Sequence, residues 1–112
     1  MGAEAVKGHL DSILLASLEA QPLHGYAIME AVRDGSRASF DLPTGTVYPA
    51  LHRLERAGLV RSKWSTVSGR RRRTYELTER GRRRLREERQ AWKLFSGAVS
   101  NLLSGAPAGA TP

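Results

Sequence analysis

The sequence contains no cysteine among its 112 residues. Disulfides, cysteine-ligated zinc, iron–sulfur clusters and thiol nucleophiles are therefore excluded, and the composition fits a reducing compartment. No apolar run reaches the length that crosses a bilayer, and the first six residues lack the basic and apolar regions of a signal peptide. We therefore expect a cytoplasmic protein with no membrane partner.

Motifs for catalysis and metal binding are also missing. The sequence has no nucleophile elbow, no glycine-rich phosphate loop after a strand and no carboxylate pair in a predicted cleft. Its three histidines, His9, His24 and His52, fall in three different predicted elements, without a second ligand at metal-binding spacing. A chain of this length has a core too small for a cleft between domains. We predict a protein that is not an enzyme and that holds no metal ion and no cofactor.

Positive charge is concentrated in the middle of the chain. The protein has 18 Lys and Arg against 11 Asp and Glu, a net charge of +7. Residues 1–32 hold one basic and four acidic side chains, whereas residues 33–93 hold 17 basic and seven acidic ones. A polyanionic partner would meet this middle region, where arginine suits contacts to phosphate and guanine. A GC-rich genome would also enrich arginine, and this alternative stays open.

The first part of the chain has helical periodicity. Apolar residues recur at spacings of three and four, and Gln21-Pro22 and Gly58 interrupt the pattern. The pattern predicts three helices, over residues 4–20, 23–35 and 43–57. The first has apolar residues on two sides, so we expect it to be buried on two faces.

After Gly58 the period changes to that of strands. Residues 59–65 and 72–77 are strand-like runs, and Ser68-Gly69 between them is a turn signal. These features predict a hairpin with a basic tip.

A long helix follows the hairpin. Thr78 is placed to cap it, and its apolar positions recur in steps of 7, 3, 4 and 3 from Leu85 to Leu102. The predicted fold is mainly α with a small β-hairpin. Residues 1–77 form a winged helix-turn-helix DNA-binding domain, residues 78–104 one long C-terminal dimerisation helix, and residues 105–112 a disordered tail.

Three stretches of the chain carry a resemblance to a known family. Leu23–Ile28, Gly45–Val60 and Gly69–Gly81 resemble motifs of the PadR family of bacterial transcriptional regulators, and the second is similar to its recognition helix. The single helix after the hairpin resembles the compact branch of the family. The resemblance implies a homodimer on double-stranded DNA, with an inverted-repeat operator. It also implies that the first and last helices of the two subunits interlock.

The helix over residues 43–57 is the predicted DNA-reading element. One of its sides is apolar, and the other suits a major groove because none of its residues is strongly apolar and few are acidic. In the hairpin, at most two of four consecutive arginines can reach one DNA surface, and we favour the two nearest the tip. The predicted DNA-binding residues are Thr44, Gly45, Thr46, Tyr48, Pro49, His52, Arg53, Arg70 and Arg71. In the alternative interpretation, Tyr48 packs on the domain, Arg53 forms an ion pair with Glu55 or the C-terminal helix, and the arginine run is a solvated face.

The long helix predicts a dimer, because so small a domain cannot bury its apolar stripe. The predicted dimerisation residues are Leu10, Leu14, Leu85, Trp92, Phe95, Val99 and Leu102. In compact PadR members a tryptophan matching Trp92 lines a pocket for planar aromatic ligands, so the resemblance implies an effector site there. The predicted ligand-binding residues are Trp92, Arg89, Lys93 and Ser96. In the alternative interpretation, Trp92 is a core residue of the helical interface.

These observations predict a homodimeric, sequence-specific DNA-binding transcriptional regulator in the cytoplasm, associated with the nucleoid. We expect a repressor that acts on an inverted repeat and is relieved by a planar aromatic molecule near Trp92. The alternative is a protein-interaction module that uses the long helix to bind a larger regulator and touches DNA only non-specifically.

Overall fold

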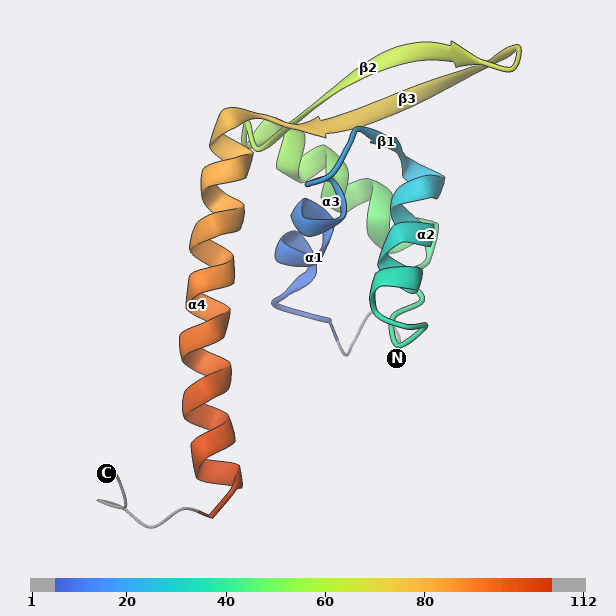
Figure 1. Ribbon diagram of the computed structural model, residues 1–112. Coiled ribbons are helices and arrows are strands. Elements are labelled where there is room, and N and C mark those ends of the chain that lie inside the picture. The colour runs from blue at the N-terminus through green and yellow to red at the C-terminus, as the bar shows by residue number, and fades with distance from the viewer. Residues whose placement is uncertain (1–5, 106–112) are drawn as a thin grey trace.

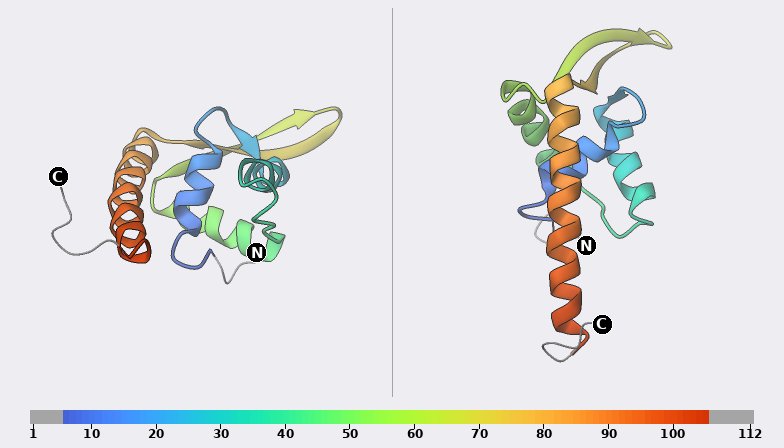
Figure 2. Two further views of the ribbon diagram at one scale, coloured as in Figure 1. Left: turned by 60° about the horizontal axis from the view of Figure 1, so that its bottom comes forward. Right: turned by 60° about the vertical axis from the view of Figure 1, so that its left-hand side comes forward.

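The computed structural model of the protein describes residues 6–105 (Figure 1). The elements in chain order are α1 (Leu10–Ser17), β1 (Leu23–His24), α2 (Gly25–Gly35), α3 (Thr44–Arg56), β2 (Val60–Val67), β3 (Arg70–Leu77) and α4 (Glu79–Leu103). The three short helices pack beneath a small sheet, and α4 runs alongside α1 and projects beyond the domain (Figure 2). The predicted winged helix-turn-helix fold with one long C-terminal helix is confirmed.

The core lies where the three short helices meet the base of the sheet. α3 contributes Val47, Ala50, Leu51 and Leu54, which recur at helical spacing and expose at most 1% of their surface. Leu14 of α1 packs into the same cluster. The predicted apolar side of α3 is therefore confirmed, and the opposite side of this helix is left toward solvent.

α1 is shorter than the sequence pattern predicts. Gly8 has a φ of +88°, which a right-handed helix does not contain, and the helix begins only at Leu10. Val6, before this turn, is buried in the core. α1 then ends at Ser17. The predicted helix over residues 4–20 is therefore wrong for residues 6–9 and 18–20, which are not helical.

The sheet has three antiparallel strands in the order β1-β3-β2. Leu23 and His24 of β1 pair with Tyr75 and Thr74 of β3. The sequence pattern assigned these two residues to a helix, because a two-residue strand leaves no alternating pattern of its own. β1 therefore holds the start of α2 against the hairpin.

The hairpin of β2 and β3, here called the wing, is longer than predicted. Its strands have eight residues each and are joined by Ser68 and Gly69, whose φ angles are +53° and +80°. Two positive φ angles are typical of the two-residue turn whose twist matches that of the strands. The predicted turn is confirmed, and the tip of the wing projects past α2 (Figure 1).

A capped start joins α4 to the wing. Thr78 Oγ1 accepts a hydrogen bond from the Gly81 amide at 3.0 Å and donates one to the Gly58 carbonyl at 2.6 Å. A Cβ atom on Gly81 would overlap the Leu59 carbonyl oxygen, so the first turn of α4 lies directly against the segment that follows α3. The predicted cap at Thr78 is confirmed.

α4 ends at Leu103, with Ser104 as its C-cap, within one residue of the prediction. Except for Gly105, the predicted disordered tail over residues 105–112 lies outside the described residues. Within residues 6–105, no helix is both long and apolar enough to cross a membrane.

Candidate nucleic-acid interface

α3 presents its predicted DNA-reading side to solvent. Thr44, Gly45, Pro49 and His52 are exposed, and Thr46 is partly exposed. No side chain caps the start of the helix, so the first backbone amides of α3 are open to an anion.

Tyr48 lies on the flank of α3 that faces α2. A Cβ atom on Gly25, the first residue of α2, would overlap the Tyr48 ring, which therefore covers this glycine. The side chain still exposes 37% of its surface. Tyr48 thus packs on the domain, as the alternative interpretation has it, and also keeps a solvent-facing part beside the reading side.

Arg53 lies on the other flank of α3. Its Nη2 pairs with Asp11 Oδ1 on α1. The predicted ion-pair partners, Glu55 and the C-terminal helix, are wrong. Because the Arg53 guanidinium is engaged with α1, its first role here is to hold α3 in place.

Strand alternation divides the four arginines of β3 between the two faces of the wing. The register places Arg71 and Arg73 on the face of the buried Tyr75, and Arg70 and Arg72 on the other face. Strand alternation turns the Arg70 and Arg71 side chains toward opposite faces of the wing, yet both line one groove, so their contact with a single DNA surface stays a prediction.

Two of these arginines are engaged with groups of the domain. Arg73 Nη2 lies 3.2 Å from Glu55 Oε1 on α3, and Arg72 Nη1 lies 3.0 Å from His24 Nε2. In contrast, no carboxylate within residues 6–105 lies at ion-pair distance from Arg70 or Arg71. Their charges are therefore left for an external anion.

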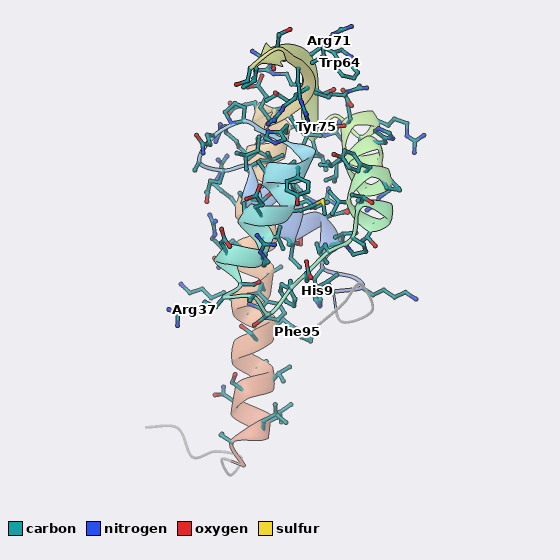
Figure 3. All side chains as sticks on the ribbon, turned by 90° about the vertical axis from the view of Figure 1, so that its right-hand side faces the viewer. His9, Arg37, Trp64, Arg71, Tyr75 and Phe95 are labelled. Carbon is teal, nitrogen blue, oxygen red and sulfur yellow. The ribbon has the colours of Figure 1, made fainter. Side chains whose placement is uncertain are left out.

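Trp64 is a candidate residue that the sequence analysis did not single out. Its indole ring lies on the same face of the wing as Arg71 and Arg73, whose guanidinium carbons are 5.0 Å and 5.8 Å from the ring centre. These are cation–π distances, and Trp64 and Arg71 lie next to each other on the wing (Figure 3). The Trp64 side chain still exposes 57% of its surface. The strand register brings the three side chains together. The sequence analysis missed this cluster because it considered the wing by its composition and not by the pairing of its strands.

An open groove of about 770 Å³ lies between the wing, the start of α2 and α3. It is lined by His24, Gly25, Tyr26, Glu30, Tyr48, His52, Trp64, Arg70, Arg71, Arg72, Arg73 and Tyr75. Four arginines against the single carboxylate of Glu30 make this groove positive. Burial raises the pKa of Tyr75, so the phenol at its base stays neutral. The groove suits a polyanion that presents phosphates and flat rings.

The predicted effector residues lie on α4, away from this groove. Trp92 exposes 55% of its surface and meets His9 edge to face, with 5.4 Å between ring centres. Phe95 lies 6.1 Å from Trp92. These three rings form an aromatic cluster between α4 and the turn before α1.

Arg89, a second predicted effector residue, is engaged with Glu19 in the segment that follows α1. It donates two hydrogen bonds to the carboxylate of Glu19, at 3.1 Å and 2.9 Å, and this pairing lowers the pKa of Glu19 and raises that of Arg89. Ser96 Oγ lies 3.5 Å from the backbone carbonyl of Lys93. Arg89 and Lys93 are the two basic residues predicted to bind the effector, and Arg89 is already paired with Glu19.

The predicted dimerisation residues separate into two groups. Leu14 and Leu85 are buried in the core of their own chain, and Leu10 packs partly against it. The prediction that Leu14 and Leu85 face a second chain is wrong, because α1 and the first turns of α4 cover each other within one subunit. The predicted residues farther along α4 remain at its surface. They are Trp92, Phe95, Leu102 and the part-buried Val99.

Comparison with known proteins identifies the family. Residues 14–87 match the transcriptional regulator PadR-like family. An uncharacterised protein from Lysinibacillus sphaericus is 30% identical over 104 residues, which are 92% of this chain and 95% of that protein. A transcriptional regulator from Mycobacterium tuberculosis is 48% identical over 56 residues, 50% of this chain and 52% of the relative.

Solved structures agree with this assignment. A PadR family transcription regulator from Clostridium difficile has a TM-score of 0.78 at 35% identity, and covers 86% of this chain and 99% of its own. A PadR-like transcriptional regulator from Bacillus cereus has a TM-score of 0.80 at 27% identity, over 93% and 100% of the two chains. Both are regulators of transcription. With its wing, its solvent-facing α3 and its single long C-terminal helix, the chain belongs to the PadR-like family of transcriptional regulators.

Proposed function

We propose that the protein is a homodimeric, sequence-specific repressor that binds an inverted-repeat operator in the cytoplasm, on the nucleoid. One observation carries this proposal: the exposed side of α3 and the uncompensated charges of Arg70 and Arg71 border the same groove. A duplex can therefore meet both at once. Operator contacts fix register through phosphates and read sequence through base edges, and this surface offers groups of both kinds.

In this arrangement α3 enters the major groove. Its first turns carry hydroxyls and open amides, and the small Gly45 and the ring of Pro49 allow close approach to the groove. The base-reading residues are Thr44, Gly45, Thr46, Tyr48, Pro49 and His52. Arg70 and Arg71 contact phosphates or the adjacent minor groove. Arg53 pairs with Asp11, and its side chain stays exposed for a phosphate contact.

The surface of α4 supports the dimer. Trp92, Phe95 and Leu102 expose 55%, 60% and 80% of their surfaces, and Leu94 and Leu103 are also exposed. An apolar stripe of this kind marks an interaction surface, and a second copy of the same helix covers it by symmetry. Two wings related by a twofold axis would meet half-sites about one helical turn, roughly 34–36 Å, apart.

The aromatic cluster of His9, Trp92 and Phe95 supports an effector site at this interface. A planar aromatic molecule would stack on Trp92, beside Lys93 and Ser96 and close to the Arg89–Glu19 pair. Such a ligand would relieve repression by favouring a dimer whose two wings have a different spacing.

Operator binding is tested on the DNA upstream of the gene, at about 150 mM salt with random competitor DNA, followed by footprinting. A protected inverted repeat is expected, and His52→Ala should weaken operator binding more than random-DNA binding. Arg70→Ala should weaken both and reduce the salt slope by about 0.9. Arg61→Ala, outside the groove, is the matched control. Equal losses on both DNAs for His52→Ala would contradict a sequence-reading α3.

The interaction-module alternative predicts different results. It requires a monomer at micromolar concentration and DNA binding that is equally weak on all sequences. Light scattering of the purified protein, beside the footprint, separates the two functions. For the effector, quenching of Trp92 fluorescence by planar aromatics is measured in a Trp64→Phe background, and the Trp64 emission of the single variant Trp92→Phe should not be quenched.

A further inference from the structure

Glu55 joins α3 to both strands of the wing. Its Oε2 accepts a hydrogen bond from Ser62 Oγ of β2 at 2.6 Å, and its Oε1 accepts one from Arg73 Nη2 of β3 at 3.2 Å. Arg73 Nε also donates to Ser62 Oγ at 2.8 Å, which closes a cycle of three side chains. The Arg73 and Glu55 side chains are only 39% and 28% exposed, so water screens their pairing less than it screens a fully exposed pair.

A second set of contacts continues from this cycle along the wing. The Arg73 guanidinium lies 5.8 Å from the centre of the Trp64 ring, and the Arg71 guanidinium lies 5.0 Å from the same centre. Trp64 and Arg73 are directly opposite each other in the strand register, and Arg71 is the next residue on the same face. A continuous row of contacts therefore runs from α3, through Arg73 and Trp64, to an arginine with no carboxylate partner in residues 6–105.

We propose that Glu55 and Trp64 are positioning residues for DNA binding. Glu55 holds Arg73 against the wing, and Arg73 and Trp64 hold the Arg71 guanidinium at a fixed place relative to α3. The base-reading helix and the phosphate-binding arginine then reach the duplex as one preorganised unit, and less conformational freedom is lost on binding. This proposal rests on the proposed function, because it requires α3 and Arg71 to contact the same operator.

The sign of the effect separates positioning from simple electrostatics. Glu55 places a negative charge close to the site of a polyanion, so its neutralisation should strengthen DNA binding if charge were its only contribution. Positioning predicts the opposite. Glu76 supplies a matched control: it pairs with Arg61 at 2.7 Å within the same wing, but on the face opposite to Ser62, Trp64 and Arg73. Glu76→Gln removes the same charge without touching the row of contacts.

The experiment measures dissociation constants of the full chain for the operator footprinted with the wild type, across a salt series. Glu55→Gln is expected to weaken binding about three- to tenfold, and Glu76→Gln to leave it equal or tighter. Trp64→Ala should weaken binding by a similar factor, and Trp64→Phe should retain most of the affinity because the ring is kept. Thermal unfolding of each variant verifies that it is folded at the assay temperature.

Arg71→Met supplies the readout that a merely structural role would not change. In the wild-type background it should weaken binding and reduce the salt slope by about 0.9. In the Glu55→Gln and Trp64→Ala backgrounds the same substitution should cost at least threefold less, because Arg71 is no longer held in place. If Glu55→Gln binds as tightly as Glu76→Gln, or if the effects with Arg71→Met are additive, the positioning proposal is overturned. A wild type that binds no operator would overturn the proposed function, and this proposal with it.

Discussion

Replacing glycine with alanine should have opposite effects on stability at two positions of α4, one packed against the segment before the wing and one exposed. Gly81 and Gly97 both lie inside α4. A Cβ on Gly81 would overlap the Leu59 carbonyl oxygen, whereas a Cβ on Gly97 would meet no atom within 4 Å. The helical positions of the apolar stripe also place Gly97 on the side of α4 away from Trp92, so a second copy on that stripe would not contact it.

The expected magnitudes follow from these surroundings. Glycine to alanine inside a helix stabilises by about 0.5–1 kcal/mol when nothing is crowded, and this value applies to Gly97→Ala. At Gly81 the obstacle is backbone, which cannot rotate away as a flexible side chain does. Overpacking of this kind costs about 1–3 kcal/mol and exceeds the helical gain. We therefore expect Gly81→Ala to destabilise the protein by about 1–2 kcal/mol.

Thermal unfolding followed by circular dichroism, at one fixed protein concentration, compares the two variants with the wild type. A change of 1 kcal/mol corresponds to a shift in melting temperature of roughly 3–6 °C for a chain of this size. The melting temperature should fall for Gly81→Ala and rise for Gly97→Ala. Equal stabilities of the two variants, or a Gly81→Ala protein as stable as the wild type, would refute the close approach of α4 to Leu59.

Other substitutions test other parts of the structure. Gly25→Ala should displace the Tyr48 ring, and it should reduce operator affinity at least fivefold while the melting temperature changes little, because a partly exposed ring can swing away; an unchanged affinity would argue against Tyr48 as a DNA contact. Ala38 has a φ of +63°, so Ala38→Gly should raise the free energy of unfolding by about 0.5–1 kcal/mol in urea titrations, and a loss of stability would contradict the left-handed backbone at this position. Arg89 lowers the pKa of Glu19 from 4.5, so the stabilisation by this pair is present above the unfolded pKa and is lost as pH falls through the folded one. The acid-induced fall in stability measured below about pH 4.5 should therefore be smaller in Arg89→Met, and an identical pH profile would show that the pair does not contribute.

Features set by a few neighbouring residues could be predicted from the sequence. The Ser68-Gly69 turn follows from the positive φ angles that a two-residue hairpin needs, and the cap at Thr78 from the position of a hydroxyl before a helix. The buried side of α3 follows from the 3.6-residue period of Val47, Ala50, Leu51 and Leu54. These three predictions are confirmed because each depends on local geometry alone.

Features set by contacts between distant residues could not be predicted in this way. β1 is a strand only because β3 lies beside it, and α1 begins late because the chain turns at Gly8 to bury Val6. Arg53 was assigned to DNA, but Asp11, 42 residues away, takes its guanidinium. A helical pattern indicates that Arg53 is exposed, but it does not reveal that the side chain is also paired with Asp11.

The sequence by itself determined the order of the elements, the basic wing and the side of α3 that faces the core, because periodicity, capping and turn preference act over a few residues. The tertiary structure alone decided which charges remain available to DNA. Arg72 and Arg73 are engaged by His24 and Glu55, and Arg70 and Arg71 are not, although the four are identical neighbours in sequence. Their difference arises from strand alternation and from the elements packed against each face, which exist only once the chain has folded.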